Sequence, residues 1–323
     1  MRILVTGGNG FIGAYILNQL VERGHEVINF DISDPSPIAS QVEDEVTFLK
    51  GDITDPVDVY DAVVSTEPDR IVHMAGILGR PCETDPRRAF EVNVEGSLNI
   101  LDAAVTCDVE RVVAAASMEV YGSVDDGRDR LTEDAPRDPK NVYGMTKYVL
   151  EYLGSTYQAQ HGVEFAALEP AHGLGPGRLR GNIDDSFVVK AAVAGVPFSV
   201  PAFEHPYEVI YIDDEARAFV DTVLADEISY DRYLVGTGEQ VTLAEFVEMV
   251  NERVEGADLE LLPPEGGMTL SSKPPIDSSR LQTDVGWEPA HSIEEAIDSH
   301  VEWLRANPDA WSFDIEQTPW DDS

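Results

Sequence analysis

The chain is poor in cysteine and lysine and has no long apolar run. Its 323 residues include two cysteines, Cys82 and Cys107, which offer neither a disulfide framework nor a CxxC metal site. The seven histidines are scattered without the close spacing of metal ligands, so we predict no metal. No run approaches the roughly 18 apolar residues of a membrane span, and no signal-like segment precedes the first expected strand. We therefore expect a cytoplasmic protein with no membrane partner.

Basic residues are scarce beside acidic ones, at 22 against 61, and the formal net charge is −39. The mutual repulsion of so many negative charges destabilises a compact chain in dilute buffer. At about 1 M salt the Debye length falls to roughly 3 Å, which screens much of that repulsion. Because the acidic residues are spread along the chain, we expect a salt-adapted cytoplasm in a halophilic organism. A nucleic-acid partner is not expected for this surface.

The N-terminal residues indicate a strand, a phosphate loop and a helix. The glycines Gly7, Gly10 and Gly13 form a Gly-x-x-Gly-x-x-Gly run that leads into an apolar helical face. Glycines let the backbone approach a pyrophosphate, whose charge is held by the free amides and the dipole of the helix N-terminus. Asp31 ends the second strand, where its carboxylate can accept ribose hydroxyls and repels a 2′-phosphate. We predict NAD rather than NADP, and a glycine turn that binds nothing is the disfavoured alternative.

Tyr143 and Lys147 are spaced as i and i+4 of an expected helix, so their side chains share one face. A cation beside a phenol favours the phenolate and lowers its pKa. We therefore expect Lys147 to lower the Tyr143 pKa and make Tyr143 a base that takes a proton from a carbinol. The alternative is that Tyr143 is a ring of the hydrophobic core and Lys147 a solvated helix residue, with no part in chemistry. A Ser-His-Asp hydrolase is a poorer explanation, because no Gly-x-Ser-x-Gly elbow is present.

Strand and helix patterns alternate through the first half of the chain. This alternation predicts an α/β fold, namely a Rossmann-type doubly wound parallel sheet with helices on both faces. Ligands bind beyond the carboxyl ends of such strands, so Gly7, Asp31, Asp52, Ala75 and Ser117 are expected on one rim. The expected strands and the main helices are Arg2–Thr6, Glu26–Phe30, Val46–Leu49, Arg70–Met74, Arg111–Ala116 and Val163–Leu168, and Pro86–Cys107 and Asn141–His161.

The pattern also divides the chain into parts. Residues 1–170 are expected to form an NAD-binding Rossmann domain, to which a strand at Glu208–Ile212 and a helix, within residues 208–226, return. Residues 171–307 are expected to form a smaller C-terminal substrate-binding lobe. Residues 308–323 make an acidic tail whose aromatic side chains dock either on the body or on a second subunit.

Several short motifs occur in the order found in the extended short-chain dehydrogenase/reductases, the NAD-dependent epimerase/dehydratase family. The chain resembles this family over nearly its whole length. The resemblance implies an enzyme that oxidises a substrate carbinol by hydride transfer to NAD, and we expect a homodimer. The matching segments are Thr6–Gly13, Gly51–Asp55, His73–Gly76, Asn93–Ser97, Ser117–Gly122, Tyr211–Asp214 and Val285–Pro289.

The resemblance assigns roles to individual residues. Ser117 is expected to hydrogen-bond the substrate oxygen, and Lys147 to hold the nicotinamide ribose as well. Alternatively, Ser117 is only a residue at a strand end whose hydroxyl makes its hydrogen bonds within the protein. The expected cofactor-binding residues are Gly7, Gly10, Phe11, Ile12, Gly13, Asp31, Asp52, Ile53, Met74, Ala75, Gly76, Asn93, Tyr143, Lys147 and Pro170.

Glu119 stands two residues after Ser117. Relatives that dehydrate or decarboxylate nucleotide sugars often carry an acid there, where it acts on the carbon next to the new ketone. Dehydratases of the deoxysugar type usually pair it with an Asp at the intervening position, which is Met118 here. Glu119 is therefore either a further catalytic residue or a rim carboxylate of an acidic protein.

Three departures from the family pattern concern the substrate diphosphate. The family's Leu-Arg-x-x-Asn is replaced by Leu168–His172, Tyr207 replaces an Arg, and Ser271–Pro275 replaces an Arg-x-Gly-Asp segment. A lost Arg removes a bidentate contact that Tyr cannot replace. Two arginines after the Gly-Pro-Gly turn are candidate substitutes. The expected substrate-binding residues are His172, Arg178, Arg180 and Tyr207.

Three functions stay open. The first, which we favour, is a nucleotide-sugar epimerase or dehydratase that keeps NAD bound and returns the hydride to its product. The second is an NAD-dependent dehydrogenase of a small hydroxyl compound, like the threonine, uronate or sugar-acid branches, which releases NADH. Glu119 favours the first and the missing phosphate ligands favour the second. A non-catalytic NAD-binding sensor is disfavoured because Ser117, Tyr143 and Lys147 are all present.

Overall fold

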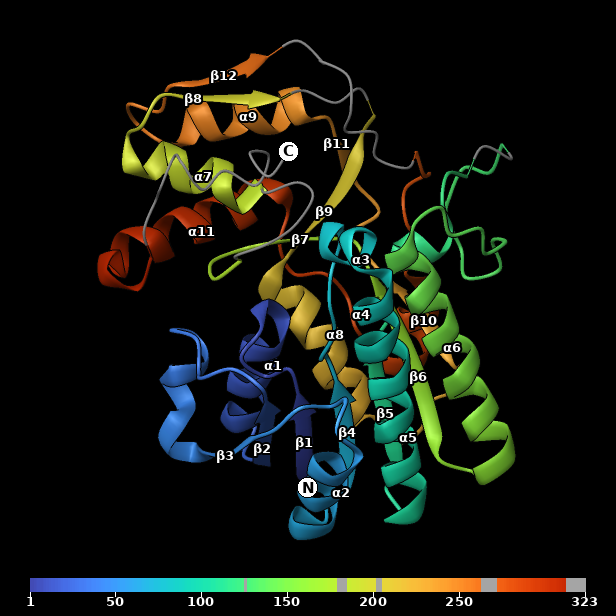
Figure 1. Ribbon diagram of the computed structural model, residues 1–323. Coiled ribbons are helices and arrows are strands. Elements are labelled where there is room, and N and C mark those ends of the chain that lie inside the picture. Colours follow the sequence, from blue (N-terminus) through green and yellow to red (C-terminus); the bar gives the residue numbers. More distant parts are fainter. Residues whose placement is uncertain (125–126, 179–184, 202–204, 263–271, 312–323) are drawn as a thin grey trace.

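A seven-stranded parallel sheet forms the centre of the molecule in the computed structural model, which describes residues 1–124, 127–178, 185–201, 205–262 and 272–311 (Figure 1). The strand order is β10-β6-β5-β4-β1-β2-β3. The α/β fold with a Rossmann-like parallel sheet is therefore confirmed. The strands are β1 (Arg2–Thr6), β2 (Glu26–Asp31), β3 (Val46–Lys50), β4 (Arg70–His73), β5 (Arg111–Ala115), β6 (Glu164–Pro170) and β10 (Arg232–Val235).

Helices cover both faces of this sheet. On one face, α1 (Phe11–Glu22) and α8 (Ile212–Leu224) pack on the inward side chains of β1, β4 and β5. On the other, α2 (Pro56–Thr66), α5 (Gly96–Thr106) and α6 (Val142–His161) do the same. Burial on both faces explains why these strands are almost wholly apolar. The helix expected at Pro86–Cys107 consists of α4 (Pro86–Phe90), a π-helical turn at Glu91–Glu95, and α5.

Two arginines anchor α8 to the sheet. Arg111, at the start of β5, is fully buried and donates to the carbonyls of Thr222 and Ala225 at 3.0 and 2.6 Å. Arg70, at the start of β4, donates to the Val223 and Ala225 carbonyls. These carbonyls belong to the last turn of α8 and to Ala225, its C-cap residue, and they lack partners within the helix. The position of α8 therefore depends on two cations from the sheet.

The remaining strands form two smaller sheets, which Figure 1 shows with their covering helices above the central sheet. Strand β9 (Tyr207–Tyr211) pairs with β7 (His172–Leu174) and β11 (Gln240–Val241), and β12 (Leu259–Leu262) pairs with β8 (Phe198–Pro201). The expectation that the strand at 208–212 returns to the first body is thus wrong, because β9 pairs within the separate sheet. The other helices are α3 (Arg80–Thr84), α7 (Asp185–Ala194), α9 (Leu243–Arg253), α10 (Ser279–Val285), α11 (Ile293–Ala306) and short 3-10 turns at Ala39–Glu45, Met118–Val120 and Pro308–Ala310.

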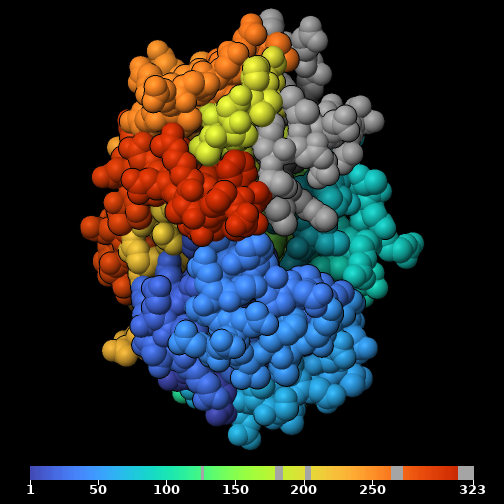
Figure 2. Space-filling view, turned by 90° about the vertical axis from the view of Figure 1, so that its left-hand side faces the viewer, coloured from blue at the N-terminus to red at the C-terminus, as the bar shows by residue number. Residues whose placement is uncertain are grey.

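The strand order reverses between β1 and β4, which places their carboxyl ends at a topological switch point. The C-terminal elements lie over that rim, and Figure 2 shows them stacked above the N-terminal residues on one face. The 171–307 segment also supplies β10 and α8 to the first body. Among the described residues, no helix combines the length and apolarity needed to cross a membrane.

Candidate active site

The glycine loop packs too closely for side chains. Gly7 has φ +71°, and a Cβ there would lie 2.6 Å from the Ala75 nitrogen. A Cβ on Gly13 would lie 2.2 Å from the Gly7 carbonyl oxygen. Helix α1 starts at Phe11 behind Gly10, with no side-chain cap and no acidic residue in its first turn. The free amides and the positive end of the dipole therefore suit an anionic pyrophosphate.

Asp31 lies beside this loop and orders it. Its Oδ2 accepts from the Asn9 amide at 2.9 Å, and its Oδ1 accepts from the Ser33 amide and hydroxyl at 2.8 and 2.7 Å. A carboxylate offers about four acceptor positions, so these contacts leave capacity for a ribose hydroxyl. The residues present thus fit a dinucleotide with an unmodified ribose. The loop-ordering contact with Asn9 could not be deduced from the sequence spacing.

The expected adenine-side residues shape the backbone. Asp52 Oδ1 accepts from the amide and hydroxyl of Thr54 at 2.9 and 2.8 Å, which closes a tight turn. Ile53 is buried beneath Gly96, where a Cβ would come within 2.7 Å of the Ile53 Cδ1 atom. The structure thus brings Asp52 to the rim and turns Ile53 into the core.

Asn93 holds the loop that follows β4. Its Oδ1 accepts from the Ile77 amide at 2.7 Å, and its Nδ2 donates to the Ile77 carbonyl and to Thr146 Oγ1, both at 3.0 Å. A Cβ on Gly76 would lie 3.2 Å from Asn93 Oδ1 and 3.5 Å from Lys147 Nζ. Asn93 is therefore committed to protein atoms, and its observed contacts support a part in shaping the pocket wall.

Other expected cofactor residues lie at strand ends on the same rim. The Met74 amide donates to the Thr6 carbonyl at 3.0 Å, and the Ala75 amide lies 3.3 Å from Thr6 Oγ1. Pro170 ends β6 opposite Val235 of β10. Met74 and Ala75 therefore follow the carboxyl end of β4 and Pro170 ends β6, and β5 separates these two strands in the sheet.

Ser117, Tyr143 and Lys147 come together at the end of β5. Ser117 follows that strand, Tyr143 lies in the first turn of α6, and the Ser117 hydroxyl is near enough to influence the Tyr143 pKa. Lys147 is buried one turn later, where its Nζ donates to the Ala115 carbonyl at 2.7 Å and lies 5.8 Å from the Tyr143 ring centre. A phenol, a hydroxyl and an ammonium on one rim can carry out acid–base chemistry on a carbinol.

The electrostatics of this group differ from the expectation. Burial raises the Tyr143 pKa above its usual range, and the Ser117 hydroxyl is the main opposing influence. The prediction that Lys147 lowers the Tyr143 pKa is wrong for this structure, because the ammonium bonds Ala115 and lies beside the ring. Burial also lowers the Lys147 pKa to about 8.

Glu119 is tied to two other segments. Its Oε2 accepts from Asn141 Nδ2 at 2.9 Å, and its Oε1 forms an ion pair with Lys273 Nζ at 3.1 Å. Sequence reasoning noted Lys273 only as part of a segment that departs from the family pattern. No local signal could have revealed the pair, because its members are far apart in the chain.

The expected substrate-binding residues that the structure describes form one cluster next to Phe11. Arg178 donates to the Gly173 carbonyl, lies 5.7 Å from the Phe11 ring centre, and approaches His172 Nε2 at 3.5 Å. The His172 and Tyr207 rings meet edge to face at 6.1 Å between centres. The Tyr207 hydroxyl donates to a buried carboxylate, that of Asp185, at 2.7 Å. Arg180 lies outside the described residues.

Glu215 belongs to the same region, and sequence reasoning missed it. It is buried in the first turn of α8, and its Oε2 has no hydrogen-bond partner among the described residues. Burial raises the Glu215 pKa to about 8, opposed by the charge of Arg178. An acidic residue in the first turn of a helix is common at exposed helix starts. The burial of Glu215 was therefore visible only in the tertiary structure.

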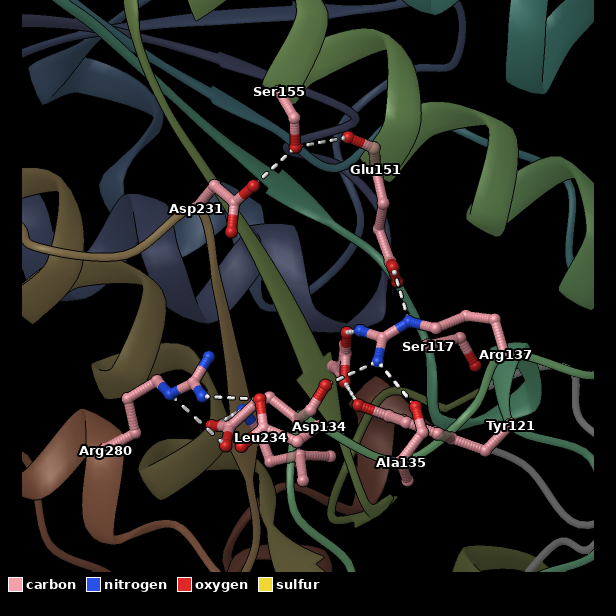
Figure 3. A network of polar contacts seen from close by, with 12 residues as sticks. Ser117, Tyr121, Asp134, Ala135, Arg137, Glu151, Ser155, Asp231, Leu234 and Arg280 are labelled. Atoms are coloured by element: carbon pink, nitrogen blue, oxygen red, sulfur yellow. Dashed lines mark hydrogen bonds and ion pairs between the residues drawn. The ribbon is translucent and has the colours of Figure 1, made fainter.

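A buried network lies behind the rim (Figure 3). Arg137 donates to Glu169 at 2.6 Å and to Glu151 at 3.2 Å, and lies 4.5 Å from the Tyr121 ring centre. Tyr121 also donates to Glu169, and burial raises the pKa of that carboxyl well above its usual value. Glu169 occupies the family's Arg position, so the cation of this network comes from Arg137 instead. A hollow of about 760 Å³ beside Arg137 and Glu151 is lined by none of Ser117, Tyr143 and Lys147.

Curated proteins similar to the chain include nucleotide-sugar enzymes. The chain is 28% identical over 313 residues to the low-salt glycan biosynthesis protein Agl12 of Haloferax volcanii, covering 94% of this chain and 98% of that protein. It is 28% identical over 329 residues to a dTDP-glucose 4,6-dehydratase of Mycolicibacterium smegmatis, covering 96% and 95% of the two chains.

A solved structure is similar over the same extent. The UDP-glucose 4-epimerase of Thermus thermophilus, in complex with NAD, matches with a TM-score of 0.82 at 30% identity and covers 94% of this chain and 99% of its own. The model of the NAD dependent epimerase/dehydratase family matches residues 3–236. The chain belongs to the NAD dependent epimerase/dehydratase family, whose cofactor is NAD.

Proposed function

We propose that the protein is a nucleotide-sugar epimerase that oxidises a sugar carbinol and then reduces the resulting ketone from the other face. The observation that carries this proposal is the placement of Ser117, Tyr143 and Lys147 on the rim that carries the glycine loop and Asp31. Bound NAD supplies the hydride acceptor and then the donor. A protein that keeps its cofactor needs no second substrate.

Tyr143 exchanges the proton of the substrate oxygen. It takes this proton as the carbinol is oxidised and gives it back on reduction. Because burial raises its pKa, the phenol is well suited to the donating direction. The Ser117 hydroxyl, which opposes the rise of the Tyr143 pKa, offsets part of the cost of the phenolate in the accepting direction.

Dehydration is the less favoured of the two reactions that the same family carries out. It needs an acid–base group next to the oxidised carbon, and Glu119 is held at both carboxylate oxygens by Asn141 and Lys273. Met118, at the intervening position, carries no ionisable group. These contacts support epimerisation over dehydration.

One observation favours the second candidate, a dehydrogenase of a small hydroxyl compound. Tyr207 stands where the family commonly has an Arg, and its hydroxyl donates to Asp185, so a carboxylate lies where a diphosphate ligand was expected. A substrate without phosphates would not be repelled there.

Product analysis separates these candidates. The NAD-loaded protein is incubated at high salt with UDP-glucose and with dTDP-glucose, and the sugars are resolved by NMR. A mixture of epimers without released NADH supports the proposal. A dehydrated keto sugar would indicate the dehydratase. Stoichiometric free NADH from threonine, a uronate or a sugar acid, with nucleotide sugars unchanged, would overturn the proposal in favour of the dehydrogenase.

A further inference from the structure

Three side chains connect the C-terminal elements to the helix that carries Tyr143, and we call them the Lys273–Glu119–Asn141 bridge. Lys273 Nζ lies 3.1 Å from one Glu119 oxygen, and Asn141 Nδ2 lies 2.9 Å from the other. The Lys273 side chain is 6% exposed and that of Glu119 is 30% exposed. A pair so shielded from water keeps more of its Coulomb energy than a surface pair. The bridge is therefore a specific contact.

The Asn141 end of the bridge controls the start of α6. Asn141 is the N-cap residue, and its Oδ1 accepts from the Gly144 amide at 2.7 Å. Because its Nδ2 donates to Glu119 at the same time, the carboxylate fixes the orientation of the capping amide. The capped turn contains Tyr143, and a Cβ on Gly144 would lie 2.5 Å from the Glu119 carbonyl oxygen. The side chain of Glu119 thus bonds the cap of this turn, and its backbone lies close against Gly144.

The Lys273 end belongs to residues 272–276, which run beside the loop that follows β5. The Leu131 amide donates to the Pro275 carbonyl at 2.8 Å. Gln240, on β11, donates from its side chain to the Lys273 carbonyl at 2.9 Å. The segment is therefore fixed to the C-terminal elements at the residue that supplies the cation.

We propose that Lys273 and Glu119 are positioning residues for Tyr143, and that Glu119 exchanges no proton with the substrate. The ammonium orients the carboxylate, the carboxylate orients the Asn141 amide, and the amide caps the turn that holds Tyr143. Both carboxylate oxygens of Glu119 accept from protein donors, Lys273 Nζ and Asn141 Nδ2, which supports a positioning role rather than a chemical one. The inference rests on the proposed function only for its kinetic test.

A substrate-free experiment tests the bridge first. Hydrogen exchange of residues 141–147 is followed by mass spectrometry in the NAD-loaded protein at high salt. Lys273→Met and Glu119→Gln should each speed exchange about tenfold, because each removes a bond to a charged group. Lys273→Arg should restore the wild-type rate. Lys140→Met is the matched control, since Lys140 is next to Asn141 in sequence but its side chain is 58% exposed. Wild-type exchange in both bridge variants overturns the proposal.

A kinetic experiment separates positioning from chemistry. UDP-glucose is mixed with the NAD-loaded protein, and bound NADH formed in the first turnover is followed by absorbance. Lys273→Met and Glu119→Gln should both slow its formation about tenfold without changing UDP-glucose affinity. Normal NADH formation with blocked product formation would mean that Glu119 acts on the substrate, and the proposal would be wrong. If the wild type forms no NADH from UDP-glucose, the proposed function fails, and hydrogen exchange alone decides the bridge.

Discussion

Tyr143 is the residue on which the proposed chemistry depends. Tyr143→Phe removes only the titrating oxygen, so NAD affinity should be retained while turnover falls about a hundredfold or more. Ser117→Ala should be milder, on the scale of one hydrogen bond to a charged oxygen, roughly 1.5–3 kcal/mol. Cofactor titration and steady-state rates with the natural substrate check both. Full turnover in Tyr143→Phe would show that another group exchanges the proton.

Asp31 should select the cofactor. We expect the wild type to bind NAD at least about tenfold tighter than NADP, because a 2′-phosphate would meet the Asp31 carboxylate. Asp31→Ala should relax this preference more than it weakens NAD. Because Asp31 also accepts from Asn9 and Ser33, Asp31→Asn is the better-matched variant, since it keeps an acceptor for the loop. Titrations of both cofactors at fixed high salt measure the preference, and equal wild-type affinities would contradict the assignment.

Glu215 makes stability depend on pH. An unfolded Glu titrates near about pH 4.3, whereas burial raises the folded-state Glu215 pKa to about 8. The folded state binds the proton more tightly, so this stabilisation is complete below about pH 4.3 and is lost as the pH rises to about 8. At about 1.4 kcal/mol per pKa unit, the loss is a few kcal/mol. Urea unfolding across this window should show a shallower decline in Glu215→Gln, and identical slopes would contradict the burial argument.

At the scale of elements, α8 depends on the arginines at the starts of β4 and β5. Arg111→Met leaves the buried Thr222 carbonyl and the half-buried Ala225 carbonyl without that donor, so the free energy of unfolding should fall by about 3 kcal/mol. Lys50→Met, which breaks an exposed pair with Asp34, should change it by less than about 1 kcal/mol. Denaturant unfolding at fixed salt compares the two. Equal effects would mean that Arg111 contributes no more than a surface ion pair.

At the scale of the whole molecule, the net charge of −39 governs behaviour in salt. Lowering salt from about 2 M to 0.1 M lengthens the range of charge repulsion, so the melting temperature and activity should both fall. Differential scanning fluorimetry across this range checks the halophilic prediction. A melting temperature that stays level would refute it. The expected homodimer can be measured in the same samples by sedimentation, at salt where the chain is folded.

Local pattern was sufficient for six of the seven strands of the central sheet. Apolar runs such as Arg111–Ala116 predicted β5 closely, and the glycine spacing predicted the turn at Gly7. Strand β10 was missed, since four residues of a later segment carry too little signal to indicate which sheet they join. The same reason explains the error over β9, because strand propensity says nothing about the partner strand.

The sequence by itself determined the family resemblance, the parallel sheet and the spacing of Tyr143 and Lys147, because each depends on residues that are near one another in the chain. The tertiary structure alone decided which charges meet. Lys273 reaches Glu119, Arg137 reaches Glu169, and burial raises the Tyr143 pKa where spacing predicted a lowered one. Desolvation and long-range pairing depend on the surroundings that the folded chain builds around a group, and no local pattern records them.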